Sequence, residues 1–295
     1  MTKVGYVKLD RGLVAITGAD RQTFLQGLIS QDVDRVSETR AAYGAFLTPQ
    51  GKYLHDFCLA EIDDRLILDG EQGRADELIA RMGRFKLRAK VDLAAADDLS
   101  VFAVFGENAP SLLNLAEKPG TARRLGDGLA FVDPRSAKLG CRLILPVAVS
   151  AAILADLPIG ESTFGDYDTL RIRLGIPDGM RDMEVEKSIL LECNFDSLNG
   201  IDWDKGCYIG QEVTARTKFR GLIKRNLVPV SVEGGPPAPG TAICADNKKV
   251  GEIRSIHDGF AIASLRLDAM ESAELGLSLT ADGAVISPLS TASTD

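Results

Sequence analysis

The part of the chain that follows Gly221 consists of short strand-like runs separated by tight turns, a pattern that few folds can accommodate. Five such runs follow one another, at residues 227–232, 241–244, 250–256, 260–265 and 277–280. Asp258-Gly259 and Asp282-Gly283 are pairs typical of hairpin turns, because these turns need a positive φ at two successive positions. Short strands with frequent turns predict a small β-barrel or a sandwich, with a domain boundary near residues 221–226.

The residues before this boundary mix helical and strand-like segments. Strands are expected at residues 12–17, 52–61, 65–68, 86–95, 99–105, 129–132 and 142–147. Apolar residues have helical spacing at 76–85 and again at 166–174, where Gly175 and Pro177 provide a stop signal. The alternation is too irregular for a doubly wound parallel sheet, so the pattern predicts an α+β fold.

Histidine is scarce in this chain of 295 residues, which holds only His55 and His257. A zinc site built from several histidines is therefore excluded, and catalysis has to use carboxylates, cysteine, lysine, arginine or a bound cofactor. The chain has 34 Lys and Arg against 42 Asp and Glu, a net charge of −8. This acidic balance argues against broad binding to nucleic acid or to a membrane surface.

The five cysteines are scattered and include no C-x-x-C pair. Their spacing fits neither a zinc ribbon nor a ferredoxin-like cluster. The first residues lack the apolar segment of a secretory signal, and no run approaches the roughly 20 apolar residues that span a bilayer. We expect a monomeric cytoplasmic protein with free thiols and no resident metal.

The stretch Lys-Gly-Cys-Tyr-Ile-Gly-Gln-Glu at residues 205–212 is poor material for a buried core. Asp204 is suited to cap a helix that runs to about Lys218. Within such a helix, Glu212 and Arg216 have the spacing of an i,i+4 ion pair. The segment is therefore predicted to be helical from its first residues.

Cys207 would lie in the first turn of that helix, beside Lys205. A helix N-terminus and a nearby ammonium group both stabilise a thiolate. Gly206 and Gly210 would let backbone or a flat ligand approach closely. Alternatively, Cys207 is a small buried apolar residue and the two glycines serve only tight packing.

Residues 205–212 resemble the K-G-C-Y-x-G-Q-E signature of the YgfZ-type folate-binding proteins, a family that includes mitochondrial iron–sulfur assembly factors. These proteins are relatives of the T-protein of the glycine cleavage system, an aminomethyltransferase. Further segments are similar to this family at residues 24–33, 47–56, 171–177, 191–194 and 250–253. The likeness covers nearly the whole chain and is strongest at residues 171–226.

The resemblance implies a T-protein-like fold, in which two α+β modules surround a central hole that accepts a folate and a β-barrel follows. The folate-binding body would span residues 1–224, with its second module at about 44–138, and the barrel would span residues 225–295. Tetrahydrofolate, or a one-carbon derivative of it, is the implied cofactor.

The resemblance also implies a set of folate-binding residues. Glu192 matches the position expected to hold the donor and acceptor edge of the pterin ring, where breaking one side of a buried pair costs about 1–3 kcal/mol. Trp203 and Tyr208 are candidate walls for the ring, although each could instead pack in the core. The glutamate tail needs cations, and nearby candidates are Lys205, Lys218 and Arg220. The remaining candidates are the signature residues Gly206, Gly210, Gln211 and Glu212.

Cys207 is the expected functional thiol, either as a redox-sensitive nucleophile or as a transient cluster ligand. A cluster needs about four ligands, so partner thiols, glutathione or a second subunit would supply the others. Asp56 lies in the neighbourhood where the T-protein uses an aspartate on a folate nitrogen, and it is the candidate acid or base. The T-protein lacks the signature cysteine, which favours the YgfZ branch.

Three functions follow as alternatives from this resemblance. The first is a folate-dependent accessory protein that supports assembly or repair of iron–sulfur clusters, including those of tRNA-modifying enzymes. The second is a tetrahydrofolate-dependent aminomethyltransferase, and the third is a folate-sensing scaffold without catalysis. The expected partners are iron–sulfur client or assembly proteins, with no direct contact to nucleic acid or to a membrane.

Overall fold

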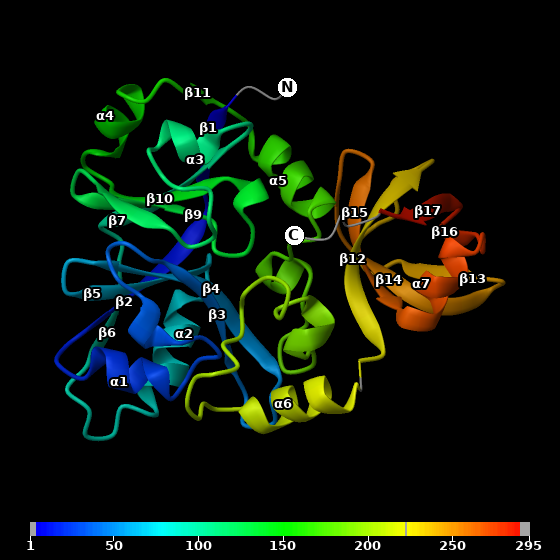
Figure 1. Cartoon of the computed structure of the whole chain (residues 1–295). Coiled ribbons are helices and arrows are strands. Elements are labelled where there is room, and N and C mark those ends of the chain that lie inside the picture. Colours follow the sequence, from blue (N-terminus) through cyan, green and yellow to red (C-terminus); the bar gives the residue numbers. More distant parts are fainter. Residues whose placement is uncertain (1–3, 222, 290–295) are drawn as a thin grey trace. The chain divides into compact units, whose positions relative to one another are not determined.

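A computed structural model describes residues 4–221 and 223–289, which fall into two units (Figure 1). The first unit comprises Met1–Phe164 and Phe195–Gln211, and the second comprises Gly165–Asn194 and Glu212–Asp295. The first unit holds two mainly antiparallel sheets with short helices, and the second holds a closed barrel, so the predicted α+β class is confirmed. The boundary at residues 224–225 and the module at 44–138 stay predictions.

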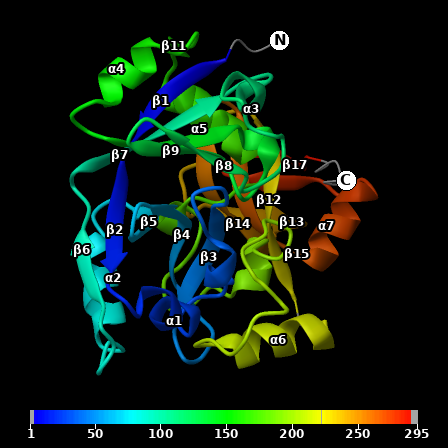
Figure 2. The same ribbon diagram turned by 60° about the vertical axis from the view of Figure 1, so that its left-hand side comes forward.

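The five-stranded sheet of the first unit has the order β3-β4-β5-β2-β6, with all neighbours antiparallel. Its strands are β2 (Arg11–Thr17), β3 (Ala42–Leu47), β4 (Tyr53–Ile62), β5 (Arg65–Glu71) and β6 (Asp92–Ala95). The short helix α1 (Arg21–Gln26) follows β2. Helix α2 (Ala75–Gly83) packs against β2 and β6 (Figures 1 and 2). The helix was expected to turn Leu78, Ile79 and Met82 inward, and Leu78 and Met82 are buried while Ile79 is half-buried.

The six-stranded sheet of the first unit has the order β11-β1-β7-β10-β9-β8. Its strands are β1 (Gly5–Leu9), β7 (Leu99–Phe105), β8 (Ala122–Leu125), β9 (Gly128–Val132), β10 (Cys141–Pro146) and β11 (Gly160–Glu161). Only β11 runs parallel to its neighbour β1. Side chains of β7, β9 and β10 pack with Leu113, after α3 (Ala109–Leu112), and Leu154, on α4 (Ser150–Ala155), in one buried cluster.

Buried ion pairs connect the two sheets of the first unit. Asp69 on β5 accepts from Arg11 at 2.6 Å and also from Arg142 on β10. Arg142 further donates to Asp133 at 3.0 Å, and Arg135 donates to the same carboxylate at 2.8 Å. Burial by itself would raise the pKa of Asp69 and of Asp133, but the facing guanidinium groups hold both pKa values below the usual range. Both carboxylates therefore stay ionised inside the unit.

The second unit contains a closed barrel with the strand order β12-β15-β14-β13-β16-β17. Its strands are β12 (Arg225–Glu233), β13 (Ala242–Ala245), β14 (Lys248–His257), β15 (Phe260–Arg266), β16 (Leu279–Ala281) and β17 (Ala284–Pro288), with α7 (Leu267–Glu274) after β15. Asp258 and Gly259 have φ values of 47° and 75°, and Asp282 and Gly283 have 48° and 80°. These positive values are those of the two predicted hairpin turns.

The other helices of the second unit precede the barrel in sequence. They are α5 (Phe164–Arg173), the 3-10 turns η3 (Gly179–Arg181) and η4 (Leu190–Cys193), and α6 (Gln211–Arg220). Gly175 has a φ of 70°, which agrees with the predicted end of α5. Buried Asp182 joins this part to the barrel, because it accepts from Arg171 at 2.8 Å and from the hydroxyl of Ser255 at 2.6 Å.

Two expected elements begin later than the sequence suggests. The strand expected at residues 86–95 is only β6, because Leu87 has a φ of 42° and the chain turns after α2. The helix expected from Asp204 begins at Gln211, so the placement of Cys207 in its first turn is wrong. Gly210 directly before α6 has a φ of 83°, which interrupts a right-handed helix at that point.

Candidate functional site

The backbone before the signature is held by residues that follow α1. Buried Ser30 donates from its hydroxyl to the carbonyl of Gly200 at 2.6 Å, and its own carbonyl accepts from the N–H of Asp202 at 2.9 Å. The side-chain amide of Gln31 donates to the carbonyl of Asn199 at 2.7 Å. These contacts within the first unit join segments that lie far apart in the sequence and fix where the signature starts.

Asp202 organises the turn into the signature. One oxygen of this buried carboxylate accepts from the backbone N–H of Asp204 at 2.9 Å and of Lys205 at 3.0 Å. The other oxygen pairs with the Arg35 guanidinium at 2.9 Å. Aspartate side chains that bind nearby backbone N–H groups offer the chain an alternative to a helix, which explains why residues 202–205 form a turn.

Lys205 anchors the signature to the end of α1. Its ammonium group donates to the carbonyls of Gln26 at 2.8 Å, Ile29 at 2.7 Å and Gln31 at 2.7 Å. It also lies over the ring of Tyr208, 5.2 Å from the ring centre. Burial lowers the pKa of Lys205 to about 8, although nearby carboxylates act in the opposite direction. An ammonium has three N–H bonds, and here each has a carbonyl acceptor.

Gly210 fixes the other end of the signature loop. A Cβ atom at this position would lie 2.6 Å from the carbonyl oxygen of Thr48 and 3.0 Å from Gly51, in the turn between β3 and β4. The N–H of Ile209 donates to the carbonyl of Gly27 at 3.2 Å, and that of Tyr208 donates to the side chain of Gln211 at 3.2 Å. Gly210 therefore serves close backbone packing in the first unit.

Cys207 lies between these two anchors and is exposed. Gly206 beside it is also exposed, and a Cβ atom there would meet nothing within 4 Å. Cys58, Cys141 and Cys193 are buried, and burial raises the pKa of each of these thiols to about 12. Cys207 is therefore the thiol of this set that reagents and partners can reach.

A pocket of about 400 Å³ lies beside the signature turn in the first unit, within the size range of small-molecule sites. Trp203 and Tyr43 line it, together with Asp202 and Arg35. The indole N–H of Trp203 donates to Asp196 at 2.7 Å, which fixes the orientation of the ring. Trp203 is half-buried, so it can serve as a wall for a ligand. Whether this wall binds a folate stays a prediction.

Asp56 is buried next to that pocket and accepts two phenolic hydroxyl groups. Tyr43 donates to one oxygen at 2.9 Å and Tyr53 donates to the other at 2.7 Å. Burial, followed by the charge of Asp56, raises the pKa of both tyrosines well above their usual value. Tyr43 also stacks on Phe195, with 5.0 Å between ring centres. Asp56 thus contacts the pocket through Tyr43, and its role as acid or base stays a prediction.

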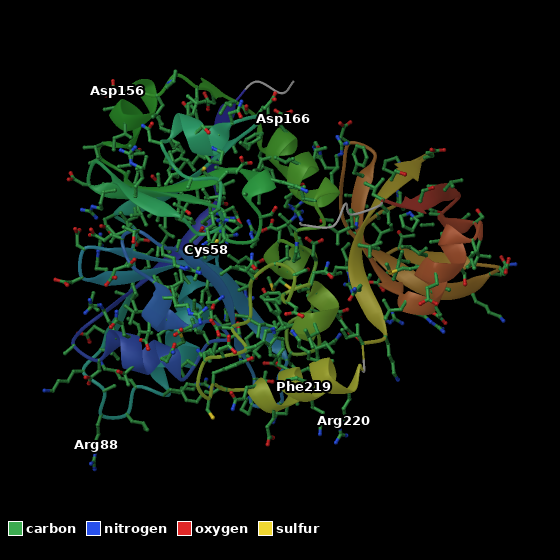
Figure 3. The ribbon with its side chains drawn as sticks, in the orientation of Figure 1. Cys58, Arg88, Asp156, Asp166, Phe219 and Arg220 are labelled. Atoms are coloured by element: carbon green, nitrogen blue, oxygen red, sulfur yellow. The ribbon has the colours of Figure 1, made fainter. Side chains whose placement is uncertain are left out.

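Glu192, Glu212, Lys218 and Arg220 belong to the second unit. Glu192 is half-buried in η4, and its carboxylate accepts from the N–H of Lys224 at 3.4 Å. Glu212 and Arg220 are exposed at opposite ends of α6, and Figure 3 shows Arg220 extending away from the ribbon. Because these residues lie in another unit than Trp203 and Cys207, the predicted folate set is divided between the units.

The predicted ion pair on α6 is absent. Across the residues that the structure describes, neither Glu212 nor Arg216 has an ion pair with any partner. Both side chains are exposed, where such a pair contributes little.

No group of three His, Cys, Asp or Glu side chains in residues 4–221 and 223–289 is placed to hold a metal ion. Over the same residues, no helix is long and apolar enough to cross a bilayer.

Sequence reasoning missed two cations at the pocket rim. Arg40 and Lys118 line the same pocket as Trp203, although they lie far from it in the sequence. The Pro119-Gly120 pair was the available signal in the sequence, since such a pair marks a turn.

Two comparisons with known proteins bear on the fold. The family model described as the CAF17 C-terminal β-barrel domain matches residues 224–292. The crystal structure of the glycine cleavage system aminomethyltransferase T from Bartonella henselae is similar with a TM-score of 0.76, covering 98% of this chain and 85% of that one. The two sequences are 15% identical, so the likeness speaks for the fold alone. It confirms the predicted T-protein-like fold with a carboxy-terminal barrel.

Curated relatives bear on the family. The mitochondrial iron–sulfur cluster assembly factor IBA57 of Mus musculus is 30% identical over 286 residues, which cover 88% of this chain and 77% of the relative. The mitochondrial homologue from Coccidioides immitis is 31% identical and is covered to 60%, and that from Mycosarcoma maydis is 34% identical and is covered to 57%. The chain thus spans less than two thirds of the length of these two fungal relatives. By its likeness to the mouse protein, the chain belongs to the IBA57 family of iron–sulfur cluster assembly factors.

Proposed function

We propose that this protein supports the assembly or repair of iron–sulfur clusters in client enzymes, with Cys207 as the thiol that meets the cluster or its carrier. The relatives are iron–sulfur cluster assembly factors by name, which supports a role in this process. The exposure of Cys207 supports its choice as the reacting thiol. A single thiol supplies one of about four cluster ligands, so the partner protein or glutathione supplies the rest.

The fixed position of the Cys207 loop is the observation that carries this proposal. Lys205 holds one end through three carbonyls, and Gly210 holds the other against the turn at residues 48–51. A thiol on such a loop is presented to a partner at little cost in conformational entropy, since the backbone is already ordered. An exposed thiol on a fixed backbone, as at Cys207, is well suited to contact a second protein.

Tetrahydrofolate or a one-carbon derivative is the proposed cofactor, and it would supply the one-carbon unit if any transfer takes place. In the first unit, Trp203 offers a wall for a flat ring. The assignment of Glu192, which lies in the second unit, to the pterin edge rests on the family resemblance. Lys205 is less suited to the tail, because its ammonium already has three acceptors. The same proposal assigns the chain to the YgfZ type. It also includes a cytoplasmic location and client enzymes that modify tRNA.

A complementation experiment tests the role of Cys207. In cells that lack this protein, we expect the wild type to restore the activity of iron–sulfur enzymes and Cys207→Ser to fail, with unchanged circular dichroism of the purified variant. Cys244→Ser is the matched control, because Cys244 lies half-buried on β13 of the barrel. Full restoration by Cys207→Ser would contradict the proposal.

Calorimetric titration tests the cofactor. Tetrahydrofolate should bind the wild type, and Glu192→Gln should bind it at least about tenfold more weakly because a partner of the pterin edge is lost. If neither protein binds, the cofactor is wrong. If both bind equally, only the assignment of Glu192 is wrong.

Aminomethyl transfer is the second candidate, favoured by the backbone likeness to an aminomethyltransferase. It would need a group that acts on the ligand, and Asp56 is 6% exposed with both oxygens bound to phenols. The assay is release of ammonia and methylene-tetrahydrofolate from an aminomethylated lipoyl carrier protein. The absence of turnover where an authentic T-protein is active would exclude this candidate.

A further inference from the structure

Two cationic side chains line the Trp203 pocket. Arg40 and Lys118 are both exposed and both line the pocket. Neither side chain has a hydrogen bond or an ion pair to any of the residues that the structure describes. Arg35 pairs with Asp202, and Asp196 keeps its negative charge while it accepts the indole N–H of Trp203, so the lining holds three cations against two carboxylates. The charge available to a ligand is therefore positive, in a chain of net charge −8.

Backbone pairing between residues 40–41 and residues 120–121 places Arg40 and Lys118 at the same pocket. The N–H of Ala41 donates to the carbonyl of Gly120 at 2.8 Å, and Arg40 pairs with Thr121 in an isolated β-bridge. A Cβ atom at Gly120 would lie 2.4 Å from the carbonyl oxygen of Ala41, so only glycine permits this approach. Lys118 closes the adjoining turn, because its carbonyl accepts the N–H of Thr121 at 3.0 Å. The pairing of the two loops thus sets both cations at one rim.

Aromatic side chains line the same pocket. Trp203 has its indole N–H fixed by Asp196, and Tyr43 has its hydroxyl fixed by Asp56 and its ring stacked on Phe195. Both residues line the pocket, but Tyr43 is only 1% exposed, so Trp203 is the ring that a ligand can stack on. A flat ring of a ligand can stack on such a side chain.

We propose that this pocket binds a small molecule that combines a planar ring with one or more carboxylate or phosphate groups. The ring contacts Trp203, and the anionic group contacts Arg40 and Lys118. This chemistry has two sources, the aminobenzoyl-glutamate part of a folate and a nucleoside phosphate. The site adjoins the signature through Asp202, which lines the pocket and accepts the N–H of Lys205. The first source would deepen the proposed folate function, whereas the second is independent of it.

Fluorescence titration tests the pocket directly, because Trp203 is the single tryptophan of the chain. The probes are p-aminobenzoyl-glutamate in one arm and adenosine monophosphate in the other, with N-acetyltryptophanamide as the control for light absorption by the probe. We expect a saturable change of Trp203 fluorescence in one arm. The double variant Arg40→Ala/Lys118→Ala should bind that probe at least about tenfold more weakly, because charge-assisted hydrogen bonds are lost.

Arg88→Ala is the matched control, because Arg88 is an exposed arginine that does not line the pocket and extends away from the ribbon (Figure 3). It should keep the wild-type affinity. No saturable change with either probe up to about 10 mM, a concentration at which binding of even a few kcal/mol is visible, overturns the proposal. Equal affinity of the double variant and the wild type for the probe also overturns the proposal. Since none of these measurements involves Cys207, their failure is distinguishable from a failure of the proposed cluster function.

Discussion

At the scale of a single residue, the position of Lys205 in the fold determines whether its ammonium group binds a ligand or the protein's own backbone. In the sequence it stands two residues before Cys207 and is a candidate to bind a ligand carboxylate. In the structure its ammonium binds the carbonyls of Gln26, Ile29 and Gln31, at the end of α1. A carbonyl that loses its partner at a half-buried site is costly to leave unpaired. Lys205 therefore acts as the tether of the signature loop.

Replacement of this tether should destabilise the protein. Lys205→Met keeps the aliphatic stem but removes three charge-assisted hydrogen bonds, and we expect the free energy of unfolding to fall by about 3 kcal/mol. Urea denaturation followed by circular dichroism measures the change. Lys90→Met serves as control, because Lys90 is exposed. Equal losses in the two variants would show that Lys205 is no tether.

His55 gives the protein a pH dependence of its own. It is 3% exposed, and burial, with Arg74 acting in the same direction, lowers its pKa from 6.5 to about 4. Between these two values the unfolded state binds more protons than the folded state, so the free energy of unfolding falls as the pH drops from 6.5 to 4. The full effect of such a shift is about 3 kcal/mol.

Removal of this group should flatten that slope. Urea midpoints measured between pH 4 and 6.5, the window that the two pKa values of His55 define, should fall less steeply in His55→Gln than in the wild type. His257→Gln, which changes the exposed histidine at the end of β14, should keep the wild-type slope. An unchanged slope in His55→Gln would contradict the assignment.

At the scale of an element, the start of α6 is set by one glycine rather than by the capping aspartate. Gly210 has a φ of 83° and lies against the turn at residues 48–51, so the helix begins only at Gln211. The residues before it remain a loop that displays Cys207. A longer helix would have enclosed the thiol in its first turn and used its backbone N–H groups differently.

The two signature glycines should respond differently to the same change. Gly210→Ala should cost about 1–3 kcal/mol, because it adds positive-φ strain and a Cβ atom that would contact the Thr48 carbonyl oxygen. Gly206→Ala should change stability by at most about 0.5 kcal/mol, because the site is open and exposed. Urea denaturation of both variants measures the two changes in the free energy of unfolding. Similar losses in both would mean that the loop needs a glycine at residue 206 for a reason other than space.

At the scale of the whole molecule, the two sheets of the first unit are joined by charges as well as by apolar packing. Arg142 reaches from β10 to Asp69 on β5 and to Asp133. Buried ion pairs of this kind add little net stability compared with apolar packing, yet they tolerate the loss of one partner poorly. The joint is therefore sensitive to single substitutions.

Arg142→Met should lower the free energy of unfolding by about 3–5 kcal/mol, because two buried carboxylates lose a shared cation. The comparison is Arg65→Met, which breaks the partly exposed pair with Asp98 at 2.9 Å and should cost about 0–1 kcal/mol. Thermal or urea denaturation measures both changes. A loss of less than 1 kcal/mol in Arg142→Met would show that the neighbouring arginines compensate for it.

The sequence alone determined the features that depend on a few neighbouring residues. The hairpins at Asp258-Gly259 and Asp282-Gly283, the end of α5 at Gly175 and the inward face of α2 all follow from local φ preferences and from the spacing of apolar residues. The short strands after residue 221 predicted a small β-barrel or a sandwich for the same reason, and the structure has a closed barrel there. The signature and the segments that resemble its family extended this prediction to the T-protein-like fold.

Only the tertiary structure decided what the polar residues of the site do. In the fold, Lys205 binds the end of α1, and Asp56 lies between two tyrosines. Arg40 and Lys118 line the same pocket. Each of these contacts joins residues that are well separated in the sequence or depends on a neighbouring strand. Local preferences carry no information about such pairs, because their energies arise only when packing brings the groups together and removes water from them.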